Sequence, residues 1–324
     1  MGYYIGIDLG GTKIAAGIID VESGTVGLRR VIPTPTSGIP EDVLDAMGSL
    51  ALQLIVESGV SVEGIGVGVP AVVDYETGRT LLVPNITGDW YQRPVVSALA
   101  QQTGLPVAIL NDARSFTLAE AVFGAGKGAQ TCVCFTLGTG IGGGTALNGR
   151  LHMGLKGAAG EFGHQIVQPG GPQCGCGSHG CLEAVASGAA ISAKAAQIAR
   201  QHSDSALAQA DKLTPAAVRD AAASGDPHAA ELLREAGFYL GIGLANTITF
   251  FAPDRVILGG GLTALGDWLL KPAREAIQQH CHTVDLTDVQ IVQAALGLDA
   301  GMVGAALWAS QQATYHDAAS SNTD

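Results

Sequence analysis

The chain has 324 residues, of which 47% are hydrophobic and 14% charged, and its formal net charge is -12. At about 150 residues per domain, this length suggests about two domains and a core that needs no disulfide staples. The apolar content excludes a disordered chain. The acidic balance argues against a protein that neutralises nucleic-acid phosphates or that binds an anionic membrane surface.

The first residues, MGYYIGIDLGGTK, lack the cationic segment and the apolar stretch of a secretory signal, so we expect a cytoplasmic protein. Two apolar stretches, 131–149 and 236–253, contain Gly, Thr or Asn and are interpreted as buried core rather than membrane spans. Three of the six cysteines fall close together in a Gly-rich loop. Without a signal peptide, this grouping favours a metal site over disulfides.

Apolar periodicity and turn residues predict a chain in which strands and helices alternate. In the first part we expect strands at 3–7, 14–19, 64–69 and 106–110, and a helix at 41–58. Next come a strand at 131–137, a turn at 138–144 and a strand at 145–147. The last part predicts helices at 183–200, 214–224, 227–251, 265–280 and 300–310, strands at 255–258 and 289–294, and a disordered tail from Thr314.

One pattern occurs twice, at Asp8 and again near Gly138: a strand, a turn rich in Gly and Thr, and a second strand. This repeat suggests two related α/β lobes, each offering one Gly-rich hairpin to a shared cleft. Gly-rich hairpins are also common as plain turns, so the repeat alone leaves both interpretations open.

The first hairpin turn has the composition of a phosphate site. Gly10 and Gly11 let the backbone approach a bulky anion, and their N–H groups can cradle phosphate oxygens. Thr12 adds a hydroxyl donor next to Lys13, and Asp8 is well placed to hold Mg²⁺ directly or through water. The alternative is an ordinary hairpin turn.

Two further Gly clusters follow predicted strands. Gly138, Thr139 and Gly140 form the second hairpin turn, and Gly259–Gly261 comes directly after a short apolar strand. A Gly run in that position lets an adenosine lie against the backbone. Each cluster alone is also explained as a turn, but three clusters that each follow a strand favour nucleotide binding.

Asn111 and Asp112 follow the apolar strand at 106–110. A carboxylate at the end of a strand suits a general base that accepts a hydroxyl proton. An N-cap of a helix at 113–123 is the alternative, and local sequence favours it. Both interpretations hold if Asn111 fixes the turn and Asp112 acts as the base.

The segment from 161 to 183 carries the strongest local signal, EFGHQIVQPGGPQCGCGSHGCLE. One imidazole and three thiolates make a closed tetrahedral set that is typical of structural zinc: His164, Cys174, Cys176 and Cys181. His179 is a rival ligand, which we rank lower because it belongs to a Ser-His-Gly turn and is expected to be exposed.

Glu161 and Glu183 bracket this loop. If zinc folds the loop, both carboxylates and His164 could converge on a polyhydroxylated ligand, because they accept or share hydrogen bonds from several hydroxyls. Surface acids are the ordinary alternative. Trp90 lies in a polar loop and is interpreted as a structural aromatic rather than as the cap of a sugar pocket.

Together these motifs resemble the ROK family of sugar kinases and repressors, within the hexokinase–actin ATPase superfamily. The resemblance runs from Asp8 to about Gly304, and every fixed position of the family signature Glu-x-Gly-His and Cys-x-Cys-Gly-x-x-Gly-Cys-x-Glu is filled between 161 and 183. The repressors of the family carry an N-terminal helix-turn-helix. Because this chain starts at the first phosphate strand, we expect the kinase branch.

The resemblance implies an α/β fold of two actin-like (ribonuclease H-like) lobes with an interlobe cleft and a structural zinc loop. The implied lobes are 1–117 plus 298–324, and 118–297 with the zinc loop and the nucleotide-binding Gly motifs. Asp112 matches the catalytic base. The resemblance also implies sugar contacts from Gly68, Asn85, Asn111, Glu161, His164 and Glu183, with Gly68 in a loop under the sugar.

The implied activity is ATP-dependent phosphorylation of a hexose, glucose above all, at the 6-hydroxyl. Mg-ATP would be the co-substrate, with Mg²⁺ and a structural Zn²⁺, and the chain would form a homo-oligomer, a dimer or a tetramer. Two positions depart from the family, with Ala71 after Pro70 and Arg114 after Asn-Asp-Ala. Kinases of N-acetylglucosamine or N-acetylmannosamine, polyphosphate as the donor, and a non-catalytic sugar sensor therefore stay open.

Overall fold

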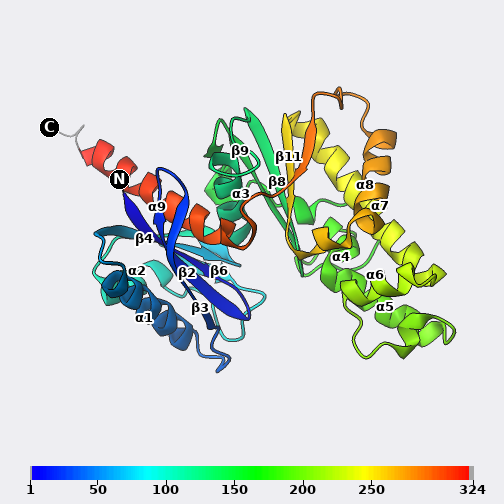
Figure 1. Ribbon diagram of the computed structural model, residues 1–324, viewed down its shortest axis with the longest axis horizontal. Helices are drawn as coiled ribbons and strands as arrows, with labels where there is room; N and C mark the ends of the chain where they lie inside the picture. Colours follow the sequence, from blue (N-terminus) through cyan, green and yellow to red (C-terminus); the bar gives the residue numbers. More distant parts are fainter. Residues whose placement is uncertain (1, 321–324) are drawn as a thin grey trace. The chain divides into compact units, whose positions relative to one another are not determined.

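The computed structural model describes the backbone of residues 2–320 and the side chains of residues 2–313 (Figure 1). By packing, the chain forms two units. Unit 1 consists of Met1–Gly128, Gly149–Ala159 and Ala295–Asp324, and unit 2 of Ala129–Asn148 and Gly160–Ala294. The units share most of their residues with the predicted lobes, whose limits stay a prediction.

Unit 1 is built on one five-stranded sheet with the order β3-β2-β1-β4-β7. Strand β1 is antiparallel to β2 and parallel to β4, which is parallel to β7. The sheet strands are β1 Tyr3–Leu9, β2 Lys13–Asp20, β3 Thr25–Pro33, β4 Val62–Val69 and β7 Val107–Asn111, and a separate ladder pairs β5 Val72–Asp74 with β6 Arg79–Leu82. The helices are α1 Pro40–Ser58, α2 Val95–Thr103, α3 Asp112–Val122 and α9 Ala300–Ser320, with the 3₁₀ turns η1 Leu155–Gly157 and η5 Gly297–Asp299.

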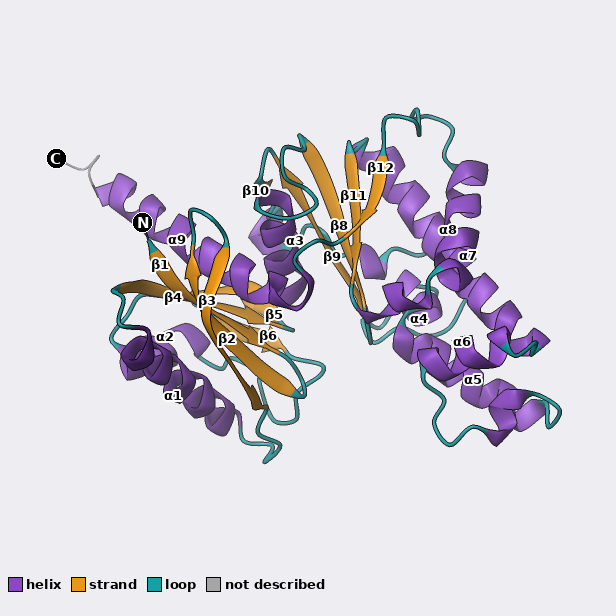
Figure 2. Ribbon diagram, in the orientation of Figure 1, coloured by secondary structure: helices purple, strands orange, loops and turns teal. Residues whose placement is uncertain are grey.

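Helices cover both faces of this sheet, with α1 and α2 on one face and α9 on the other (Figure 2). Such two-sided burial explains why β1 and β4 read as nearly continuous apolar runs. Helix α1 begins with Pro40 in its first turn and ends at Gly59, which has a φ of 66°. Both residues suit the conformations found at those helix ends.

Helix α9 lies in direct backbone contact with the sheet. A Cβ built at Gly6 in β1 would lie 1.9 Å from the Met302 carbonyl oxygen, and one at Gly66 in β4 would lie 1.8 Å from the Ala305 carbonyl oxygen. Only glycine permits an approach this close. The glycines of these two strands therefore fix where the C-terminal helix docks.

Unit 2 repeats this architecture with the strand order β10-β9-β8-β11-β12. Strand β8 is antiparallel to β9 and parallel to β11, which is parallel to β12. The strands of unit 2 are β8 Thr131–Leu137, β9 Ile141–Leu147, β11 Arg255–Gly259 and β12 Gln290–Gln293. The edge strand of this order, β10 Arg150–Leu151, falls within the residues of unit 1. The helices and 3₁₀ turns are η2 Phe162–His164, α4 Leu182–Ala186, α5 Gly188–Gln201, η3 Ala206–Gln209, α6 Pro215–Ala223, α7 Pro227–Phe251, η4 Gly261–Leu265 and α8 Asp267–His280.

The predicted mixed α/β fold with a repeated hairpin is confirmed, while several local predictions are wrong. The turn expected at 138–144 is shorter, because Gly142–Gly144 lies inside β9. The helix expected at 183–200 is two helices that break at Ser187, whose side chain caps α5. Strand β3 and helix α2 were not expected. The tail expected to be disordered from Thr314 is helical to Ser320, and 321–324 lie outside the described residues.

Within the described part of the chain, no helix has both the length and the apolar character needed to cross a membrane. The two apolar stretches noted in the sequence form the β8–β9 hairpin and the second half of α7.

Candidate functional site

Three neighbouring parallel strands of unit 1 end at the same edge of the sheet. In the register of β1, β4 and β7, Asp8 pairs with Gly68, and Gly68 pairs with Leu110. Helix α3 begins at Asp112, directly after β7. The fold therefore brings Asp8 and Asp112 to one edge, which is where α/β sheets commonly bind ligands.

Both carboxyl groups have raised pKa values. Surrounding protein atoms remove Asp112 from water and raise its pKa to about 7, and the negative charge of Asp8 adds to this effect. Burial likewise raises the pKa of Asp8 to about 6, against the opposing influence of the Lys13 ammonium group. A carboxyl with a pKa near 7 is suited to accept a proton at neutral pH.

Asn111 explains why helix α3 starts at this point. Its side-chain oxygen accepts hydrogen bonds from the amides of Ala113 (3.0 Å) and Arg114 (3.2 Å), while its side-chain nitrogen donates to the Ala71 carbonyl (3.2 Å). The helix-cap interpretation therefore holds for Asn111, while Asp112, the first residue of the helix, accepts a hydrogen bond from the Ala113 amide through Oδ1 (2.8 Å). Contact of Asn111 with a sugar stays a prediction.

Gly68 does not lie in a loop, as the sequence suggested, because it is a buried residue of β4. A Cβ at this position would lie 3.1 Å from Ser115 Oγ on α3. Gly68 therefore contributes by letting α3 pack close to the strand that runs beside Asp8.

The first hairpin is closed by its own backbone. The amide of Gly10 donates to the Lys13 carbonyl (2.9 Å), and the Thr34 hydroxyl donates to the Gly10 carbonyl (2.7 Å). Gly11 and Thr12 are exposed at the tip. If this hairpin binds phosphate, we expect the amides of Gly11 and Thr12 to do so, because the amide of Gly10 is used in the turn.

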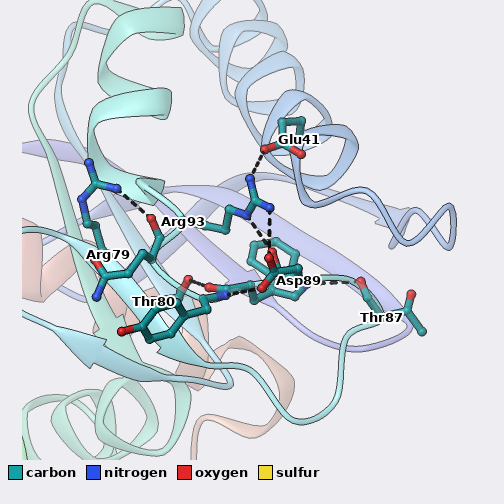
Figure 3. A network of polar contacts seen from close by, with 9 residues as sticks. Glu41, Arg79, Thr80, Thr87, Asp89 and Arg93 are labelled. Atoms are coloured by element: carbon teal, nitrogen blue, oxygen red, sulfur yellow. Dashed lines mark hydrogen bonds and ion pairs between the residues drawn. The ribbon is translucent and has the colours of Figure 1, made fainter.

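The loop that carries Asn85 lies against this hairpin, since a Cβ at Gly11 would lie 2.6 Å from the Asn85 carbonyl oxygen. Polar contacts hold the loop in place (Figure 3). Arg93 pairs with Glu41 of α1 at 2.8 Å, and the buried Trp90 donates from its indole to the Thr87 carbonyl. Trp90 is thus a structural aromatic, as expected, while the Asn85 side chain is exposed.

In unit 2, the second hairpin borders a cavity of about 560 Å³. The carbonyl oxygens of Gly138 and Thr139 accept hydrogen bonds from the Gly188 and Ala189 amides, the first two of helix α5. The cavity is lined by Gly138, Thr139, Gly188, Ala189, Ser192, Thr214, Pro215, Ala216, Gly261 and Leu262. Two of the three predicted Gly motifs therefore meet around one cavity.

Gly260 makes this meeting possible. Its φ is +90°, and a Cβ there would lie 2.4 Å from the Leu137 carbonyl oxygen, immediately before the second hairpin turn. A side chain at this position would be both strained and obstructed. The turn after β11 can therefore follow the backbone of β8 closely.

Glu183 also contacts the second hairpin, through a hydrogen bond from the hairpin backbone. One carboxylate oxygen of Glu183, on α4, accepts a hydrogen bond from the Ile141 amide (2.9 Å) and lies beside Gly140. This position gives Glu183 a structural contact at the hairpin that the sequence did not indicate. Contact of Glu183 with a sugar stays a prediction, as it does for the exposed Glu161.

The predicted zinc ligands lie together in unit 2. The ligand atoms of His164, Cys174, Cys176 and Cys181 are all within 4.8 Å of one another. Cys174 Sγ lies 3.6 Å from His164 Nδ1, and the sulfur atoms of Cys176 and Cys181 are 3.7 Å apart. His179 is exposed and not among the clustered ligands.

These distances fit a tetrahedral ion. Zn–S bonds of about 2.3 Å and Zn–N bonds of about 2.0 Å give edges of about 3.8 Å between two sulfurs and about 3.5 Å between sulfur and nitrogen. Burial, together with the neighbouring thiols, raises the pKa of Cys181 to about 12. Three thiolates in so small a space need a cation, so the donor set fits zinc.

Some residues of these sites carried no signal in the sequence. Thr214 and Pro215 line the cavity. In the sequence, however, a Thr-Pro pair indicates only the start of a helix, and these two residues are the N-cap and first residue of α6. Gly301, at the start of α9, lies against Asp8, because a Cβ there would be 2.7 Å from the Asp8 carboxyl carbon. Contacts of this kind join segments far apart in the chain and cannot be predicted from spacing.

Comparison with known proteins gives a consistent result. Residues 4–312 match the model of the ROK family. A glucokinase from Streptomyces coelicolor is 39% identical over 315 residues, which cover 94% of this chain and 97% of the relative.

Two solved structures are also similar. A ROK family glucokinase from Streptomyces griseus, in complex with glucose and AMPPNP, has a TM-score of 0.80 and 38% identity, and the match covers 96% of this chain and 100% of the other. A ROK hexokinase from Thermus thermophilus has a TM-score of 0.83 and 37% identity, with coverage of 96% and 99%.

Proposed function

The chain belongs to the ROK family, and on that premise we propose that it is an ATP-dependent sugar kinase that phosphorylates the 6-hydroxyl of a hexose, with glucose as the preferred substrate. The observation that carries the proposal is Asp112, whose pKa is raised to about 7 at the edge of the sheet that also holds Asp8. The glucokinases among the similar proteins support the choice of glucose.

In the proposed reaction, Asp112 accepts the proton of the sugar hydroxyl while the hydroxyl oxygen attacks the γ-phosphorus of ATP and the bond to ADP breaks. Phosphoryl transfer has a loose transition state, so positioning and charge neutralisation supply most of the catalysis. Base catalysis adds about 10²–10⁴-fold. Asn111 fixes the start of α3 and thereby the position of the Asp112 backbone.

For the nucleotide, we propose that the cavity beside Gly138 and Gly261 takes the adenosine. The exposed hairpin tip at Gly11 and Thr12 would donate hydrogen bonds to phosphate oxygens. Asp8 would hold Mg²⁺, for which a carboxylate oxygen is a suitable ligand, and the ion would neutralise phosphate charge.

We propose that zinc has a structural role, held by His164, Cys174, Cys176 and Cys181. The loop that these ligands close lies between Glu161 and Glu183 in the sequence, so its folding would fix both acids as sugar contacts.

The test is a coupled assay of ADP release with Mg-ATP across glucose, mannose, fructose, N-acetylglucosamine and N-acetylmannosamine. Strong turnover with glucose and weak turnover with the amino sugars is the expected result. Silence across the panel, from zinc-loaded protein that still binds ATP, contradicts the kinase assignment and leaves a non-catalytic sugar sensor.

An amino-sugar kinase is the second candidate, because the two departures from the family pattern lie beside Asn111, a predicted sugar contact. The two family departures, Ala71 and Arg114, both contact the Asn111 side chain through their backbone groups. The buried Arg114 side chain also donates to the Ala159 carbonyl (2.9 Å). Turnover with N-acetylglucosamine or N-acetylmannosamine above that with glucose would establish this alternative.

A further inference from the structure

A second group of metal-ligating side chains occurs in unit 2, apart from the three cysteines and His164. The ligand atoms of His202, Asp204 and His228 all lie within 4.8 Å of one another. The two imidazole rings are stacked, with their centroids 3.9 Å apart and an angle of 28° between the planes. The sequence motifs and the proposed kinase chemistry leave all three residues without a role.

The backbone at the two histidines is fixed by hydrogen bonds. His202 ends helix α5, where its amide donates to the Ile198 carbonyl and its carbonyl accepts from the Ser205 amide (2.9 and 3.1 Å). His228 is the second residue of helix α7, and its amide donates to the side chain of Asp226 (2.9 Å). The imidazoles therefore project from the end of one helix and the start of another.

The carboxylate of Asp226 ties these two segments together. It is buried, with only 7% of the residue exposed. One oxygen accepts from the Ser205 hydroxyl (2.5 Å) and the Ala206 amide (2.7 Å), and the other accepts from the amides of His228 and Ala229. Asp226 is thus a support of the cluster and not a member of it. The backbone of both segments is therefore held in place, while the side chains of the cluster can still rotate.

The donor set defines the class of ligand. Two imidazoles and one carboxylate suit divalent cations of the later transition series, among them Zn²⁺, Co²⁺ and Ni²⁺. Around a four-coordinate ion with bonds of about 2.0 Å, ligand atoms lie about 3.3 Å apart. The stacked rings must therefore turn toward each other for binding. Both histidines are only half-buried and Asp204 is exposed, so rotation of these side chains displaces no core.

We propose that His202, Asp204 and His228 bind one divalent transition-metal ion, with the remaining coordination positions open to water. The ion would join the end of α5 to the start of α7. This site shares no residue with the proposed zinc loop. None of its three residues has a place in the proposed kinase reaction.

Cobalt distinguishes the two sites by their chemistry, because thiolate ligands give Co²⁺ an intense charge-transfer absorption that imidazole and carboxylate ligands do not. Full-length protein that already holds one equivalent of zinc is titrated with Co²⁺. We expect a second equivalent to bind, with ligand-field bands and without the thiolate absorption. Absence of a second equivalent, or cobalt bound only with thiolate absorption, would overturn the proposal.

Substitutions locate the second equivalent. His202→Gln and His228→Gln should each weaken Co²⁺ binding at least about 100-fold, the upper end of the loss from removing even an outer-shell partner. The exposed His152, outside the cluster, gives the matched control His152→Gln, which should bind as the wild type does.

Thermal unfolding shows whether a variant has lost cobalt binding only because its fold is less stable. Before cobalt is added, the two cluster variants should melt within a few degrees of the wild type, and cobalt should raise the Tm of the wild type and of the control alone. Unchanged cobalt affinity in both cluster variants would show adventitious binding elsewhere and refute the assignment.

Discussion

In unit 1 the pair Leu9–Ile14 closes the first hairpin, and in unit 2 the pair Leu137–Ile141 closes the second. With these pairs aligned, Asp8 in β1 corresponds to Thr136 in β8. The first hairpin thus has its own carboxylate next to the turn. The second has none at that position, and it receives a carboxylate from Glu183 of α4 instead.

The difference shows that the same hairpin backbone is combined with different side chains in the two units. In unit 1, Asp8 lies near the end of β1 and Asp112 directly follows β7, with β4 between the two strands, and the pKa values of both acids are raised. In unit 2 the same hairpin geometry is combined with a cavity at the start of α5 and with a cysteine cluster. On the proposed function, we infer that unit 1 provides the base, the Mg²⁺ ligand and the phosphate contacts, and that unit 2 provides the adenosine cavity and the zinc site.

The largest effect is expected in unit 1. Asp112→Asn should lower kcat by about 10²–10⁴-fold or more, because the amide cannot accept the hydroxyl proton. Steady-state kinetics with the preferred sugar measure this loss, and isothermal titration should show that sugar binding is retained. Asp211→Asn, which changes an exposed acid of unit 2, is the control and should keep full activity. Turnover of Asp112→Asn near the wild-type level would show that Asp112 is not the catalytic base.

The next effect concerns the cysteine cluster of unit 2. Cys176→Ala should release zinc and raise the KM for the sugar at least about tenfold, more than it lowers kcat, because the loop between Glu161 and Glu183 loses its fixed shape. Metal analysis and kinetics measure both changes. Cys281→Ala changes a buried thiol outside the cluster and should keep zinc. An unchanged KM in verified zinc-free protein would contradict this role.

A smaller effect separates two adjacent glycines. Gly260→Ala should destabilise the protein by about 1–3 kcal/mol, because Gly260 has a φ of +90° and its Cβ would meet the Leu137 carbonyl. Gly261→Ala is the matched control, since a Cβ there meets nothing within 4 Å. Denaturant unfolding measures both variants. Equal stability of the two would show that the close approach at the second hairpin is not required.

The smallest effect is a shift in pH dependence. A base with a pKa of about 7 is active when deprotonated, so kcat/KM should be constant above about pH 7 and fall as the pH drops below it. Asp8→Asn removes the charge that helps to raise the pKa of Asp112, so the midpoint should move to lower pH. Loss of the proposed Mg²⁺ ligand also lowers the overall rate, so the midpoint alone is compared. A pH profile of each enzyme measures this shift. A midpoint that stays in place would show that the two carboxyls do not interact.

Much of the fold could be predicted because apolar periodicity marks the core strands and long helices. Strand β3 was missed because its residues alternate between exposed and half-exposed, which leaves no apolar run. The break at Ser187 was missed because a serine can lie inside a helix or cap one. Gly142–Gly144 resembled a turn, yet a Cβ at Gly143 would lie 2.5 Å from the ring of Phe162, so packing requires glycine inside this strand.

The clustering of the zinc ligands followed from sequence spacing because all four lie within 18 consecutive positions. The metal-ligand cluster at His202 and His228 could not be predicted in the same way. Its two histidines belong to separate helices, and the carboxylate that joins their segments, Asp226, looks like a simple N-cap in the sequence.

The docking of α9 on Gly6 and Gly66 also bears on how the protein is made. Ribosomes synthesise a chain from its N-terminus, so the whole of unit 2 emerges before α9, which packs against the first strands and places Gly301 beside Asp8. Strand β1 is therefore made well before α9, and the surroundings of Asp8 are complete only after α9 has docked. We therefore expect a ribosome-bound chain that stops short of α9 to lack the proposed kinase activity.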